Sequence, residues 1–132
     1  MQLALLPREI TPQTVLEALL QRIGPENGAS VRELASEVLG RPARPSDERV
    51  LRTVVMQLRN AGHPVCSTPD EGYHHAANAA DLQRTCLHLT HRAVTSLEQV
   101  AAMRRIALPD FYGQLGLPVP ANTEDTDHAD RD

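Results

Sequence analysis

The sequence predicts a mainly α-helical domain in which three helices precede a β-hairpin and a long fourth helix follows it. Three observations predict this architecture. Apolar residues recur at helical spacing in four segments. Ser, Thr, Asn, Gly and Pro stand where helices start and stop. Apolar residues make up 41% of the 132 and aromatic residues only 2%, so the core is aliphatic. A chain of this length forms one small domain with a core of its own, without a disulfide or a metal.

The first two helices are bounded by residues that favour helix ends. A helix over residues 12–23 is predicted from the repeat of its apolar side chains. A second helix over residues 31–39 opens with a capping box, Ser30-Val-Arg-Glu33. The residues that cap or stop these helices are Thr11, Gly24-Pro25, Ser30 and Gly40. Residues 1–10 form an N-terminal arm ahead of them.

The third helix is predicted to lead directly into a hairpin. The helix follows a rigid basic connector, residues 41–45, and runs over residues 47–61 with Ser46 as its N-cap. Gly62 ends it, and we expect this glycine at positive φ. Two short extended runs on either side of a Gly-containing loop then predict a β-hairpin over residues 63–76.

A long fourth helix is predicted over residues 78–108, with Asn78 as its N-cap and Pro109 as its stop. Residues 109–118 are expected to pack as a C-terminal segment. Residues 119–132 hold five acidic residues against one Arg, which accounts for the whole formal charge of −4. This segment lacks apolar periodicity, so it is predicted to be a disordered acidic tail.

Three helices followed by a hairpin is the order of a winged helix-turn-helix, and one stretch makes the resemblance specific. The stretch is Leu58-Arg-Asn-Ala-Gly-His-Pro-Val-Cys-Ser-Thr-Pro-Asp-Glu-Gly-Tyr73. It resembles the helix end, turn and wing of the DNA-binding domain of biotin operon repressor-type proteins, and of small winged-helix proteins of phages and prophages. The resemblance implies a winged-helix domain over residues 11–77 that binds double-stranded DNA. Nothing like the biotin-ligase domain follows, so ligase activity is not implied.

In such a fold the third helix contacts DNA. The helical period places Leu51, Val54, Val55 and Leu58 on the core side. The opposite side carries Arg49, Thr53, Met56 and Asn60, with Arg52 and Gln57 at its margins. Arg, Asn, Gln and Thr side chains pair with base edges in the major groove. The resemblance adds Arg32, Arg41 and Arg44 as phosphate contacts, which position a protein without reading sequence. The alternative is that this side of the helix is simply polar and solvated.

Charge supports DNA contact at one place and opposes it at another. All thirteen basic residues are Arg, and five of them lie in residues 41–59 against two acids. Arg is well suited to bind phosphate and guanine. The hairpin turn, however, contains Pro69-Asp-Glu71, and two carboxylates near phosphate are repulsive. We therefore expect the wing to stay off DNA.

The fourth helix carries more apolar surface than one small core covers. One stripe consists of Leu82, Cys86, Leu89, Ala93, Leu97, Val100 and Met103, and a second of Leu87, Val94, Ala101 and Leu108. We predict a homodimer through Leu87, Ala93, Val94, Leu97 and Ala101, which presents two copies of the third helix to a palindromic site. The alternative is packing within the chain, against Met1–Leu6 and Phe111–Leu117.

No catalytic, metal or cofactor site is predicted. The histidines and the two cysteines, Cys66 and Cys86, match no recognised zinc spacing, and nothing suggests an oxyanion site or an orienting group for a nucleophile. Cys86 lies on an apolar stripe and is expected to be buried and inert. Two isolated cysteines and no membrane-length apolar run favour a cytoplasmic protein. The sequence thus predicts a DNA-binding transcriptional regulator, or alternatively a protein-interaction module that keeps the fold without binding DNA.

Overall fold

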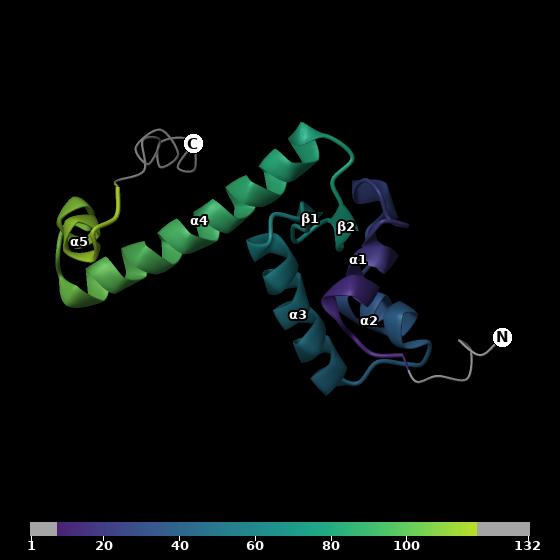
Figure 1. The fold of residues 1–132 in the computed structure, drawn as a ribbon. Coiled ribbons are helices and arrows are strands. Elements are labelled where there is room, and N and C mark those ends of the chain that lie inside the picture. The colour runs from purple at the N-terminus through teal and green to yellow at the C-terminus, as the bar shows by residue number, and fades with distance from the viewer. Residues whose placement is uncertain (1–7, 119–132) are drawn as a thin grey trace. The chain divides into compact units, whose positions relative to one another are not determined.

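The computed structural model describes residues 8–118. The chain divides into two compact units, Met1–Leu89 and Thr90–Asp132, with the division inside one helix. The described elements (Figure 1) are α1 Pro12–Leu19, the 3-10 turn η2 Pro25–Asn27, α2 Val31–Leu39, α3 Pro45–Asn60, β1 Val65–Cys66, β2 His74–His75, α4 Ala79–Arg104 and α5 Leu108–Leu115. The fold is therefore mainly helical with a small two-stranded antiparallel sheet, as the sequence predicts. None of the helices described is long and apolar enough to span a membrane.

The core of the first unit is built from α1, α2 and α3. Its buried side chains are Val15, Leu19, Ala29, Leu34, Ala35, Val38, Leu51, Val54, Val55, Leu58 and Val65. All four side chains predicted on the core side of the third helix belong to this set. Burying a Leu or Val completely stabilises a fold by roughly 1.5–3 kcal/mol, so this aliphatic set holds the three helices together. The opposite side of α3 is thereby left at the surface.

The predicted caps of the first two helices are confirmed. Thr11 Oγ1 accepts from Thr14 N at 3.1 Å, and the hydroxyl of Ser30 accepts from Glu33 N at 3.1 Å. Glu33 completes the capping box, because its carboxylate accepts from Ser30 N at 3.0 Å. Gly40 ends α2 at φ 72°, the left-handed conformation that glycine adopts without strain.

Two of the helix boundaries predicted for the first three helices are wrong. The first helix ends at Leu19 rather than at Ile23, because the chain there pairs with β2: His75 N donates to Arg22 O at 2.9 Å. The third helix begins at Pro45, with Arg44 rather than Ser46 as its N-cap. Proline fits the first helical position, since the N–H that it lacks has no partner there. The Asp47 carboxylate then accepts from Arg44 N at 2.9 Å.

The hairpin is present as predicted, and a third segment joins it. Val65 pairs with His75 and Cys66 with His74, antiparallel, directly after Gly62 at φ 97°. The connection between α1 and α2 lies along the other edge of β2, where Ala29 and Tyr73 exchange two backbone hydrogen bonds of 3.0 and 2.7 Å. The sequence did not predict this pairing.

The second unit consists of the rest of α4 and α5. The long helix ends at Arg104 rather than at Leu108, and Arg105 follows with φ 58°. Pro109 does not stop α4 but lies in the first turn of α5, where a missing N–H is tolerated. Phe111 and Tyr112, within the segment 109–118 that we expect to pack, are buried, whereas residues 113–118 are exposed. Burial and then the nearby Glu98 carboxylate of α4 raise the pKa of the Tyr112 hydroxyl. The predicted tail, 119–132, and Met1–Leu6 lie outside the described residues.

Candidate nucleic-acid interface

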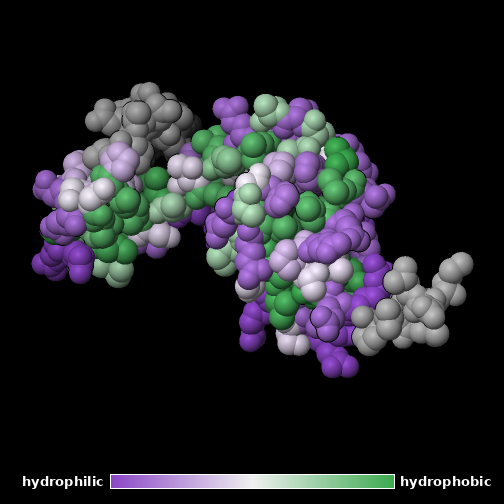
Figure 2. Space-filling model, in the orientation of Figure 1, coloured by the Kyte–Doolittle hydropathy of each residue, from purple (hydrophilic) through white to green (hydrophobic). Residues whose placement is uncertain are grey.

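The side of α3 opposite the core is a continuous exposed surface. We name it the α3 face; it consists of Arg49, Arg52, Thr53, Met56, Gln57 and Asn60, all of them exposed. The structure thus brings together every residue predicted to read bases. The Thr53 hydroxyl donates to the backbone of its own helix, at Arg49 O, over 3.2 Å. Figure 2 shows the first unit with polar side chains at the surface and apolar patches between them.

Three of the predicted DNA-contacting arginines are held by carboxylates of α3. Glu48 lies between Arg32 of α2, at 3.1 Å, and Arg52 one turn along α3, at 3.8 Å. Arg41 of the connector binds Asp47 at 3.0 Å, and its hydrogen bond is the main reason why the pKa of Asp47 lies below its usual range. The sequence showed these charges but not their pairing, which brings Arg32 and Arg52 to one carboxylate.

Arg44 and Arg49 differ from these three. Both are exposed, and within residues 8–118 neither side chain forms an ion pair. Their guanidinium groups are therefore the ones on this surface that no carboxylate pairs with. They lie at the N-cap and in the second turn of α3, so the uncompensated positive charge is concentrated at the start of that helix.

A fifth arginine of the basic segment has a structural role that the sequence did not reveal. Arg59 is half-buried at the end of α3, where its Nε donates to Val65 O at 2.8 Å and its Nη2 to Ser67 Oγ at 3.0 Å. These bonds fasten β1 to α3. Arg59 therefore contributes to the position of the hairpin rather than to the exposed charge of α3.

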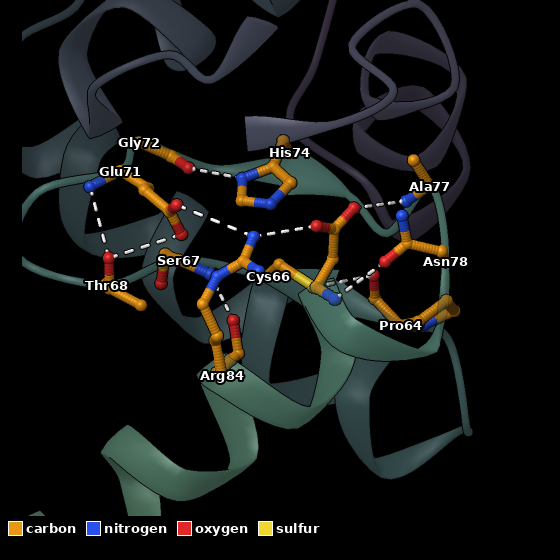
Figure 3. A network of polar contacts seen from close by, with 12 residues as sticks. Pro64, Cys66, Ser67, Thr68, Glu71, Gly72, His74, Ala77, Asn78 and Arg84 are labelled. Atoms are coloured by element: carbon orange, nitrogen blue, oxygen red, sulfur yellow. Dashed lines mark hydrogen bonds and ion pairs between the residues drawn. The ribbon is translucent and has the colours of Figure 1, made fainter. Parts of the chain in front are cut away.

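The hairpin turn is less acidic than its sequence suggests. Thr68 and Glu71 pair through backbone bonds of 3.0 and 3.1 Å, which leaves Pro69 and Asp70 at the tip. The Glu71 carboxylate turns away from the tip toward α4, where Arg84 lies 3.6 Å from it (Figure 3). Of the two carboxylates expected to repel phosphate, Asp70 is therefore exposed at the tip, whereas the charge of Glu71 is paired with an arginine distant in sequence.

A groove of about 470 Å³ separates the turn from the start of α2 and from α3. Its walls are formed by residues 28–31, Glu33, Arg52 and the hairpin residues 67–73. Arg52 thus belongs both to the α3 face and to the groove. The turn and the α3 face therefore border one continuous surface.

A scan against protein-family models, a search of the curated proteins and a search of the solved structures each found no match for this chain.

Helix α4 leaves large apolar side chains exposed. Leu87, in the first unit, is 56% exposed, and Met103, in the second, is 77% exposed. Of the residues predicted at a dimer interface, Leu87 and Ala93 are exposed, Val94 and Leu97 are half-buried, and Ala101 is buried. Ala101 is only 5% exposed, so its own chain already covers it. Near the C-terminal end of α4, at Ala101, the apolar side chain is therefore packed within the chain, which is the alternative to a dimer contact.

The cysteines differ in their surroundings. Cys66 is buried, and burial raises the pKa of its thiol. Cys86 is exposed, so the prediction that it is buried is wrong, because α4 turns Asp81 and Thr85 rather than Cys86 toward the hairpin. His74 is completely buried, and its Nδ1 donates to Gly72 O at 2.8 Å. In the described part of the chain, no three His, Cys, Asp or Glu side chains gather to hold a metal ion.

Proposed function

We propose that residues 11–77 form a winged helix-turn-helix domain and that the protein binds double-stranded DNA sequence-specifically, as a transcriptional regulator of bacterial or phage origin. The α3 face carries this proposal. It presents arginine, asparagine, glutamine and threonine on the exposed side of one helix, and these side chains match the donors and acceptors of base edges. The order of α1, α2, α3 and hairpin also supports it. We propose a cytoplasmic protein with no enzymatic activity and no cofactor.

Different arginines take different roles in this proposal. Arg49 and Asn60 of the α3 face contact bases in the major groove, while Arg44, at the N-cap of α3, contacts a phosphate. Arg32 and Arg41 join it on the phosphates by exchanging their carboxylate partners for DNA. The exchange costs little, because an exposed ion pair is worth only about 0–1 kcal/mol.

The proposed DNA-binding form is a twofold homodimer. Helix α4 supplies the interface through Leu87, Ala93, Val94 and Leu97; Ala101, which its own chain covers, is not part of it. A twofold axis presents two α3 faces to the two halves of a palindromic site. The exposed apolar side chains of α4 support this, since they lose contact with water when a second copy covers them.

The first experiment measures binding to random duplex DNA by fluorescence anisotropy at increasing salt concentrations. A protein that places several arginines on phosphates loses affinity steeply as salt rises. Selection from a random library then identifies a cognate site. On that site, Arg49→Ala and Asn60→Ala should each cost about 1–3 kcal/mol.

Arg44→Ala tests the phosphate role, and Arg92→Ala is its matched control. Arg44→Ala should weaken binding to all sequences alike and flatten the salt slope by about one unit. Arg92 is an exposed arginine of α4, so the control removes the same charge outside the α3 face and its flanks. Cognate binding unchanged by Arg49→Ala, Asn60→Ala and Arg44→Ala would refute the assignment of this surface.

A second candidate function is a protein-interaction module that keeps the fold without binding DNA. One observation favours it: Val50 and Met56 leave 47% and 58% of their surface exposed on α3, next to arginines that already pair with the chain's own carboxylates. Apolar side chains with matched charges around them suit a protein partner. Absence of DNA binding at low salt would favour this candidate over the first.

A further inference from the structure

We infer that Arg84 is a positioning residue that sets the charge of the hairpin turn. It holds the Glu71 carboxylate against α4, so that the turn presents to solvent the carboxylate of Asp70 and not that of Glu71. The inference rests on the proposed function, because the turn borders the same groove as Arg52 of the α3 face. It extends that function, because Arg84 of α4 then affects DNA affinity through the hairpin turn and independently of dimerisation.

Arg84 lies between two carboxylates and is anchored by one of them. Its Nη2 lies 2.7 Å from Asp81 Oδ1 and 3.6 Å from Glu71 Oε2. Asp81 is buried in the first turn of α4, and its other oxygen accepts from Ala77 N at 2.8 Å. That backbone bond, and then Arg84, hold the pKa of Asp81 below its usual value, so Asp81 is a charged and fixed support. Arg84 is thereby aimed at the turn.

The backbone of the turn is fixed without Arg84. Thr85 Oγ1 accepts from Ser67 N at 3.1 Å, and His74 Nδ1 donates to Gly72 O at 2.8 Å, so one bond fixes each side of the turn (Figure 3). Thr68 and Glu71 close the turn through their own backbone groups. The Glu71 carboxylate also accepts from the Thr68 hydroxyl, over 3.4 Å, inside the turn. Removing the guanidinium therefore frees the Glu71 carboxylate from α4, leaves it with this one contact within the turn, and leaves the backbone of the turn in place. The change is one of charge and not of backbone position.

The released carboxylate would act on DNA at short range. Glu71 and Asp70 are neighbours at the edge of the groove, and Arg52 lines the same groove. Charges are screened over about 8 Å at physiological salt, so a second carboxylate freed at this groove acts on a phosphate that approaches it and competes with that phosphate for Arg52. With Arg84 in place, this second repulsion is absent.

The test is a double-mutant cycle on the full chain with Arg84→Ala, Glu71→Gln and the double variant. Arg84→Ala should weaken binding to random duplex about two- to fivefold, the size expected of one partly exposed ion pair. In the Glu71→Gln background the same change should have little effect, because no carboxylate is left to release. Arg84→Lys, which keeps the charge, should recover part of the affinity. Arg92→Ala removes an exposed arginine from the same helix and should respond identically with and without Glu71.

A second measurement separates this inference from the proposed function. Urea unfolding, without DNA, is measured for the wild type, the Arg84→Ala and Glu71→Gln variants and the double variant. It should show coupling between the two positions of about two- to fivefold in the unfolding constant. If the wild type binds duplex but the two positions show no coupling in either measurement, the inference is wrong and the function stands. If the wild type binds no duplex, the proposed function is wrong, and so is the predicted effect of Arg84 on DNA affinity. The unfolding cycle then still shows whether Arg84 holds the Glu71 carboxylate.

Discussion

Replacing Gly72 with alanine should destabilise the first unit through a single steric conflict. A Cβ at this position would lie 2.6 Å from the carbonyl carbon and oxygen of Ala29 and 2.7 Å from its nitrogen. These are backbone atoms that cannot turn aside as a side chain can. Gly72 does not have a positive φ, so the cost comes from this contact and not from backbone conformation.

The magnitude follows from the bonds that must break. Relieving the overlap separates Ala29 from Tyr73 and loses their two hydrogen bonds, of 3.0 and 2.7 Å. Each is worth about 1 kcal/mol net and more when a buried group stays unpaired, so the expected loss is about 2–4 kcal/mol. That is a large part of the roughly 5–15 kcal/mol that holds a small domain together.

Urea denaturation followed by the helical circular dichroism signal measures this loss. The matched control is Gly113→Ala in α5, which adds the same methyl group where, apart from the neighbouring helix backbone, no atom lies within 4 Å. The control should not destabilise, because alanine favours a helix over glycine by about 0.5–1 kcal/mol. If Gly72→Ala is as stable as the control, the connection between α1 and α2 does not lie along β2.

Three further predictions concern charge and assembly. Asp81→Asn should destabilise the protein near neutral pH, because folding lowers the pKa of Asp81 from its ordinary 3.8. The difference in stability from wild type should disappear as the pH falls through that lowered pKa. Urea denaturation at a series of pH values measures it. Glu48→Gln should raise affinity for random duplex and steepen the salt slope by about one unit in an anisotropy titration, because it releases two arginines. Leu87→Glu with Val94→Glu should give a folded monomer by sedimentation at micromolar concentration, whereas a monomeric wild type would refute the dimer.

The helix ends that the sequence predicted correctly are those set by local chemistry. Thr11, Ser30 and Asn78 act on backbone groups three residues away, as in the bond from Asp81 N to Asn78 Oδ1 at 3.0 Å. Such contacts lie within one turn, so a short window of sequence contains both partners. The core side of α3 was predictable for the same reason, since one helical period determines it.

The candidate site was predicted only in part, because its charges pair over long distances in the sequence. The α3 face is where periodicity placed it, but Arg59 turns to the hairpin and Glu71 to Arg84. The short sequence segment around each of these residues does not contain its partner, which is Val65 for Arg59 and Arg84 for Glu71. The wrong predictions at Ser46 and Pro109 have another cause, which is the position of a proline. Pro45 occupies the first turn of α3, so the N-cap is Arg44 and not Ser46, and Pro109 lies in the first turn of α5 instead of ending α4.

The pairing of the α1–α2 connection with β2 also determines the order in which the chain folds. During synthesis α1, α2 and α3 leave the ribosome first, but the N–H of Gly24 and both backbone groups of Ala29 have no partners until Tyr73 and His75 follow. Contacts between residues so far apart carry a loop-closure cost and form late. Until then the three helices lack Val65 from their core and expose an unpaired backbone edge, which is the kind of edge that captures another chain. The first unit therefore becomes a cooperative structure only when β2 has been made.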